Sequence, residues 1–62
     1  MKFETALRLM RKGEKVTQSH KKYKHLIIKN GELLSVEQGY ETEVKTFEAD
    51  DILAENWEVV DD

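Results

Sequence analysis

The chain has 62 residues, of which 39% are hydrophobic and 37% charged, and its formal net charge is −3. This length allows at most one domain, residues 1–62, and the composition is typical of a compact fold and not of a disordered chain. The lack of cysteine excludes disulfides and thiolate metal sites, and two histidines without a partner motif do not predict a structural zinc site.

Residues 3–12 are expected to form an amphipathic helix. The apolar side chains recur at the spacing of one helix face, at Phe3, Ala6, Leu7 and Met10. Gly13 follows the last basic residues and is suited to the left-handed conformation that ends many helices. The β-branched Val16 and Thr17 then predict a short strand over residues 16–19.

The stretch from Lys24 to Glu37 predicts a β-hairpin. Asn30-Gly31 separates two apolar runs, and this dipeptide favours a type I′ turn because both central residues need a positive φ. A two-residue loop fixes the register, so that Lys29 faces Glu32. The pairing then continues outward from the turn, one residue earlier on the first strand and one residue later on the second. Side chains then alternate between two faces. One face carries Leu26, Ile28, Leu33 and Ser35, and the other carries His25, Ile27, Leu34 and Val36.

Three further elements are expected after the hairpin. Gln38-Gly39 breaks the run, and the alternation over residues 40–47 predicts an edge strand centred on residues 43–47. Residues 49–55 predict one or two helical turns that bury Ile52 and Leu53, and residues 57–60 predict a last strand.

Together these elements predict an α+β fold, in which the N-terminal helix packs on a small, mainly antiparallel sheet and a short helix precedes the last strand. One long helix covers one sheet face only, so a second apolar face marks a subunit interface. We therefore expect a homodimer or a higher oligomer built on two-fold symmetry. The candidate interface residues are those of the two hairpin faces, either Leu26, Ile28 and Leu33 or Ile27, Leu34 and Val36. The alternative is a curled sheet that covers its second face with Trp57, Phe47 and Tyr40.

Charge is divided unevenly along the chain. Residues 1–31 hold nine basic and two acidic side chains, whereas residues 32–62 hold one basic and eleven acidic side chains. This asymmetry suggests an anionic ligand at the basic end or a charged partner at the acidic end. The simpler alternative is that the two halves neutralise each other within the fold or across subunits.

The residue types favour binding over catalysis. The sequence has no nucleophile elbow, no metal-binding helix motif and no glycine-rich phosphate loop, so we expect no enzyme activity, no metal and no cofactor. A cluster of cations around one ring is a candidate ligand site, because cations hold phosphates and a ring can stack on a base. The cluster comprises His20, Lys21, Lys22, Tyr23 and Lys24. Its alternative role is a solvated loop.

Charge and hydropathy also bear on nucleic acid and membrane as partners. A nucleic acid is disfavoured because the chain is acidic overall and its basic segment is short. A membrane is not expected either, since no stretch approaches the about 20 apolar residues of a span and no signal peptide follows Met1. We therefore expect a cytoplasmic protein. Its acidic C-terminal half, or an apolar sheet face, could inhibit a host protein.

The two ends of the chain resemble one known family. The opening MKFETALRLMRKGEKV is similar to the F-x-x-A-L-x-x-(L/M)-x-x-G-x-x-V start of a family of small phage and bacterial proteins that contains Thoeris anti-defence protein two. The closing ADDILAENWEVV resembles that family's D-(I/L)-L-A-x-(D/N)-W-E-V-V ending. The matching positions are Phe3, Ala6, Leu7, Met10, Gly13, Val16, Asp51, Ile52, Leu53, Ala54, Trp57, Glu58, Val59 and Val60.

The resemblance implies a bacteriophage-type anti-defence protein that assembles from dimers into tetramers in the host cytoplasm. Such proteins capture a cyclic ADP-ribose-like or other cyclic nucleotide signal by stoichiometric binding, without breaking a bond. The family's binding region commonly has an Arg after the first strand and a Trp three residues later. The chain departs from this pattern with Gln18 and Lys21, a shorter middle and no Pro-Trp before the closing helix. The resemblance therefore adds Gln18 to the candidate ligand-binding residues.

Overall fold

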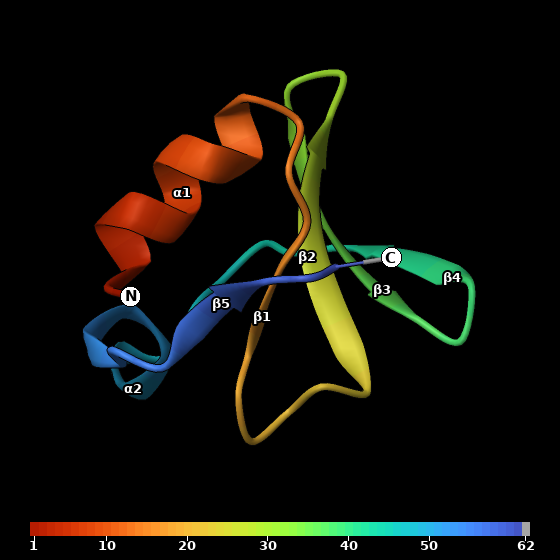
Figure 1. The fold of residues 1–62 in the computed structure, drawn as a ribbon. Helices are drawn as coiled ribbons and strands as arrows, with labels where there is room; N and C mark the ends of the chain where they lie inside the picture. The colour runs from red at the N-terminus through yellow and green to blue at the C-terminus, as the bar shows by residue number, and fades with distance from the viewer. Residues whose placement is uncertain (62) are drawn as a thin grey trace.

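The computed structural model describes residues 1–61 and contains a helix packed on a five-stranded sheet (Figure 1). The elements in chain order are α1 (Phe3–Arg11), β1 (Val16–Gln18), β2 (Lys24–Lys29), β3 (Glu32–Glu37), β4 (Tyr40–Glu43), α2 (Ala49–Leu53) and β5 (Trp57–Val59). The strand order is β4-β3-β2-β1-β5, and every neighbouring pair is antiparallel. The predicted α+β architecture, with a short helix before the last strand, is confirmed.

Helix α1 packs on the sheet through the predicted apolar stripe. Ala6 and Met10 are fully buried, while Phe3 and Leu7 pack at the margin of the same core. Gly13 ends the helix with φ 98°, and the two backbone N–H groups of residues 13 and 14 donate to the carbonyls of Met10 and Leu9. This pair of hydrogen bonds is the Schellman arrangement, which satisfies carbonyls that the helix itself leaves free.

The central hairpin has the predicted register throughout. All six residue pairs between β2 and β3 match, from Lys29 opposite Glu32 to Lys24 opposite Glu37. Asn30 and Gly31 have φ values of 54° and 78°, as a type I′ turn requires.

The hairpin faces the core with its Leu26 side. Leu26 is buried beside α1, and Ile28 and Leu33 pack against the same cluster. These three residues therefore stabilise the single chain. Ile27, Leu34 and Val36 lie on the opposite face, where Leu34 is buried and the other two are half-buried. That face stays a predicted subunit interface.

The alternative covering of the second face by aromatic side chains is wrong. Trp57 and Phe47 both lie on the α1 side, where their rings contact Phe3. Tyr40 leaves 77% of its surface exposed. The rings lie on the α1 side because the buried apolar cluster that includes Met10 is on that side.

Strand β4 begins and ends earlier than predicted. It covers Tyr40–Glu43 and not residues 43–47, and it pairs with β3 alone at the sheet edge. Gln38 and Gly39 have φ values of 52° and 83°, so they form a second tight turn and the strand starts directly after it. The following segment leaves the sheet because the Phe47 ring packs on Phe3, with centroids 5.2 Å apart.

The predicted burial of Ile52 and Leu53 is wrong. The two side chains are 47% and 75% exposed. Helix α2 is held instead through Asp51, whose backbone carbonyl accepts a hydrogen bond from the Trp57 indole at 3.1 Å. This contact turns Asp51 toward the sheet and leaves the two aliphatic residues beside it on the outside. Figure 1 shows α2 beside the N-terminal end of α1, on the same side of the sheet.

The uneven charge distribution is partly neutralised inside the chain. Among the described residues, ion pairs join lysines of the first half to acids of the second half: Lys21–Asp51, Lys22–Glu58 and Lys29–Glu41. The N–O distances are 3.6, 3.1 and 3.7 Å. Part of the charge asymmetry therefore reflects self-complementarity within the fold.

Candidate functional site

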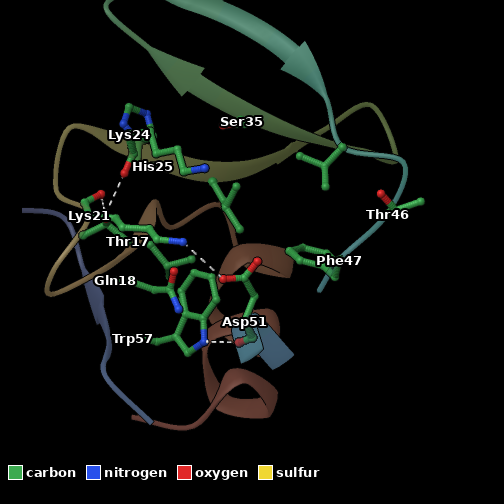
Figure 2. Close-up of a pocket in the computed structure, with 13 residues that line it drawn as sticks. Thr17, Gln18, Lys21, Lys24, His25, Ser35, Thr46, Phe47, Asp51 and Trp57 are labelled. Atoms are coloured by element: carbon green, nitrogen blue, oxygen red, sulfur yellow. Dashed lines mark hydrogen bonds and ion pairs between the residues drawn. The ribbon is translucent and has the colours of Figure 1, made fainter. Parts of the chain in front are cut away.

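A pocket opens on the helix side of the sheet, where β1 and β2 extend beyond α1. Its volume is about 120 Å³, and its walls come from β1, β2, the 44–47 segment, α2 and β5 (Figure 2). The lining residues are Val16, Thr17, Gln18, Lys21, Lys24, His25, Leu26, Ser35, Val44, Thr46, Phe47, Asp51 and Trp57. The pocket therefore combines segments from both halves of the chain.

Aromatic rings form one wall of the pocket. Trp57 is 4% exposed and lies with its ring centroid 5.4 Å from that of Phe3, which in turn contacts Phe47 edge to face. The indole N–H of Trp57 donates to the Asp51 carbonyl, as Figure 2 shows. The ring is thus fixed in position from both sides, and it offers a rigid apolar surface to a flat ligand group.

Two ammonium groups lie among the pocket-lining residues. Lys21 Nζ is 3.6 Å from the Asp51 carboxylate, and both side chains keep about a third to a quarter of their surface exposed, 35% and 25%. Lys24 Nζ lies 5.9 Å from the centre of the Tyr23 ring. Within residues 1–61 no carboxylate is close enough to pair with Lys24. The lining therefore carries two cations and one anion, which favours an anionic group.

Gln18 supplies an amide without a protein partner. It is the last residue of β1, its side chain lies on the same face as Trp57, and it is 6% exposed. In the part of the chain that the structure describes, its side-chain amide makes no hydrogen bond. The amide atoms are not among the enclosed atoms without a partner, so they are open to the pocket.

The connection from β1 to β2 is held in place by a buried hydroxyl. The Thr17 Oγ1 lies 2.6 Å from the carbonyl oxygen of Lys24 and 3.1 Å from that of Lys21, and it donates its hydrogen to one of them at a time. The Lys21 N–H donates to the Gln18 carbonyl at 2.9 Å. These bonds fix the backbone of both pocket lysines.

The predicted ligand-binding residues are divided by the structure. Gln18, Lys21 and Lys24 line the pocket. Lys22, by contrast, forms an ion pair with Glu58 at 3.1 Å, and the His20 ring contacts the Asn56 amide.

Tyr23 is the remaining member of the predicted cluster. It is 62% exposed and does not line the pocket. Its ring centre lies 5.9 Å from the Lys24 ammonium. Trp57, which the sequence patterns did not place in the site, lines the pocket instead.

Several pocket residues could not be found from local sequence patterns. Phe47, Asp51 and Trp57 come from segments more than 20 positions beyond β1, and they reach the pocket because β5 pairs with β1. The pairing of Gln18 with Trp57 is the signal that connects them. It depends on long-range contacts that the sequence pattern alone does not specify.

A second polar cluster lies outside the pocket. The Ser19 hydroxyl lies 3.0 Å from the Glu58 carboxylate and also 3.0 Å from the Asn56 carbonyl. Hydrogen bonds from Lys22 and then from Ser19 hold the pKa of Glu58 below its ordinary value. The Asn56 side-chain oxygen is buried without a partner in the described residues. This cluster fastens the connection after β1 to the start of β5.

Comparisons with protein-family models, with curated proteins and with solved structures find no match to this chain. Among residues 1–61, no helix is long and apolar enough to cross a membrane. The same residues contain no group of three or more side chains placed to hold a metal ion.

Proposed function

We propose that this chain is a phage-type anti-defence protein that binds a nucleotide immune signal and sequesters it without catalysis. The observation that carries the proposal is the pocket whose lining includes Lys21, Lys24 and Trp57. Cations that accept a phosphate and a ring that stacks on a base are the two parts of sequence-tolerant nucleotide recognition. The resemblance of both chain ends to the anti-defence family points in the same direction.

The size of the pocket limits how much of the ligand one chain encloses. Its volume of about 120 Å³ is below the about 300–1,000 Å³ of pockets that enclose a whole drug-sized ligand. A cyclic ADP-ribose-like molecule or a cyclic oligonucleotide therefore inserts one group and extends across the mouth. A homodimer or homotetramer, formed through the face of Ile27, Leu34 and Val36, would provide the remaining cover. The site of action would be the cytoplasm of the host cell.

The test is calorimetry with cyclic ADP-ribose isomers and cyclic dinucleotides, followed by heat denaturation and recovery of the ligand. We expect saturable binding with a fixed stoichiometry and release of the ligand chemically intact. Conversion of the ligand would contradict sequestration, and the absence of heat with every nucleotide would refute the proposed function.

Two lysines provide a matched pair of variants. Lys24→Glu places a negative charge in the pocket, whereas Lys22→Glu makes the same change outside it, beside Glu58. A hydrogen bond to a charged group contributes about 1.5–3 kcal/mol, so Lys24→Glu should weaken binding by roughly 10- to 150-fold. The Lys22→Glu variant should bind within a few-fold of the unaltered protein. Equal losses would show that general charge, and not the pocket, governs binding.

A second candidate function is inhibition of a host protein. Ile52 and Leu53 are exposed on α2, next to a hollow of about 340 Å³ that also involves Phe3. The acidic Glu4 and Glu55 line the same hollow together with one basic residue, Lys2. An apolar surface with an acidic margin suits a partner that presents basic and apolar side chains. Leu53→Ser should abolish this activity and leave nucleotide binding unchanged, which separates the two functions.

A further inference from the structure

Gln18 carries a polar group that no hydrogen bond within residues 1–61 uses. It lies at the end of β1 and is 6% exposed, yet its amide has no hydrogen-bond partner within residues 1–61. Polar groups of mostly buried residues are normally paired. The amide atoms of Gln18 are not among the enclosed unpaired atoms of the described residues, so they are open to the pocket that Gln18 lines. Figure 2 shows the side chain beside the Trp57 ring, among the residues that line the pocket.

The amide offers one hydrogen-bond donor group and one acceptor on adjacent atoms. A ligand edge that satisfies both must carry an acceptor next to a donor. The N6 amino group and N7 of adenine form such an edge, and a glutamine amide pairs with both at once. On the same edge a 6-oxopurine presents two acceptors. They can pair with the NH₂ group of the amide, but they leave its carbonyl oxygen without a hydrogen-bond donor.

The shape of the pocket agrees with a flat ring. An apolar cavity of about 150 Å³ in a protein core holds one benzene molecule, and this pocket of about 120 Å³ is also open on one side. Trp57 and Phe47 line it with their rings, so an inserted heterocycle has an aromatic surface to contact while its edge meets Gln18.

The charges of the pocket lining indicate where the phosphate of the ligand would bind. Lys24 carries no carboxylate partner in the described residues and belongs to the same lining as Gln18. A phosphate joined to the heterocycle through a sugar would therefore lie at Lys24 while the ring occupies the pocket.

We propose that Gln18 is the specificity-determining residue of this pocket and that it selects an adenine ring over a 6-oxopurine ring in a nucleotide ligand. This inference rests on the proposed function, because it requires that the pocket binds a nucleotide at all. Gln18 reads the base edge, Trp57 contacts the ring face, and Lys24 binds the phosphate.

The experiment compares adenosine monophosphate with inosine monophosphate, which differ at the ring edge and share the sugar and the phosphate. Trp57 is the only tryptophan in the sequence, so its fluorescence reports occupancy of the pocket directly. A correct bidentate pair discriminates by roughly 5- to 150-fold, and we expect the unaltered protein to prefer adenosine monophosphate within this range. Calorimetry provides a second measurement of the same ratio.

Gln18→Met is the informative variant, because it keeps the length of the side chain and removes the amide. We expect the preference to fall to about 1 while the phosphate contact with Lys24 remains. We also expect the melting temperature to stay close to that of the unaltered protein, because the variant removes no existing hydrogen bond. A lower melting temperature would overturn the inference, since it would show that the amide has a stabilising partner in the folded protein.

The failures of the two proposals are distinguishable. If both monophosphates and cyclic nucleotides bind but the two monophosphates bind equally, the role of Gln18 is refuted and the proposed function stands. The same conclusion follows if the preference survives in Gln18→Met. If no nucleotide changes the Trp57 fluorescence or produces heat, both proposals are refuted.

Discussion

Replacing Asp51 with asparagine should strengthen the binding of anions. The Asp51 carboxylate lies 3.6 Å from Lys21 Nζ, so it competes with any phosphate for that ammonium group. A phosphate seated on Lys21 would lie about 6 Å from the carboxylate. Two unit charges at that separation repel by about 0.7 kcal/mol in water and by about 2.8 kcal/mol at the effective dielectric constant of a protein surface.

The exposure of the pair places the expected value between these limits. The two side chains are 35% and 25% exposed, which indicates partial screening and an effect of about 1–2 kcal/mol. The affinity for inorganic pyrophosphate should therefore rise roughly 5- to 30-fold in Asp51→Asn at low ionic strength, as measured by Trp57 fluorescence. Added salt should reduce the gain.

Asp50→Asn is the matched control. Asp50 lies in the same first turn of α2 and carries the same charge, but it is exposed and does not line the pocket. We expect its effect on pyrophosphate binding to stay below about 2-fold, since solvent screens a charge outside the site. Equal effects of the two variants, or weaker binding by Asp51→Asn, would refute the assignment of Asp51 as the competing anion.

Two further predictions concern stability. Met10→Ala should lower the free energy of unfolding by about 2–5 kcal/mol because Met10 is fully buried. Leu9→Ala on the same helix should lower it by less, since Leu9 is only half-buried and lies outside the core cluster. Urea denaturation followed by circular dichroism measures both, and a loss at Leu9 as large as that at Met10 would contradict the packing of α1. The second prediction follows from the lowered pKa of Glu58, whose contribution to stability is present at pH values above the ordinary range of a glutamate and is lost as the pH falls through the lowered pKa. Denaturation between neutral and acidic pH should therefore show a smaller acid-induced loss in Glu58→Gln, and an unchanged pH profile would refute the contribution.

The parts of the fold that depend on neighbouring residues could be predicted from the sequence. The Asn30-Gly31 turn determines the register of β2 and β3 because only two residues separate the strands. The spacing that ends at Met10 identifies the buried side of α1 for the same local reason. The Gln38-Gly39 turn carried an equally local signal, and interpreting it as a simple break displaced the predicted strand by three residues.

The parts that depend on distant residues could not be predicted in this way. Ile52 and Leu53 have the composition of core residues, but Trp57 occupies the space beneath α2 and binds the Asp51 carbonyl. Which helical side chain faces inward is decided by that one tertiary contact. Only part of the predicted cluster lines the pocket for a similar reason, since Lys22 pairs with Glu58 outside it.

The pairing of β1 with β5 makes the pocket a late product of folding. Residues 24–37 can form their hairpin as soon as they are synthesised, because their contacts are local, whereas Gln18 meets Trp57 only after a chain segment of almost forty residues has closed on itself. A ligand held between these two residues would recognise the completed fold and not the hairpin alone. Each bound molecule would then slow the detachment of the C-terminal strand, so a chain that captures a signal would also gain a longer lifetime against proteases.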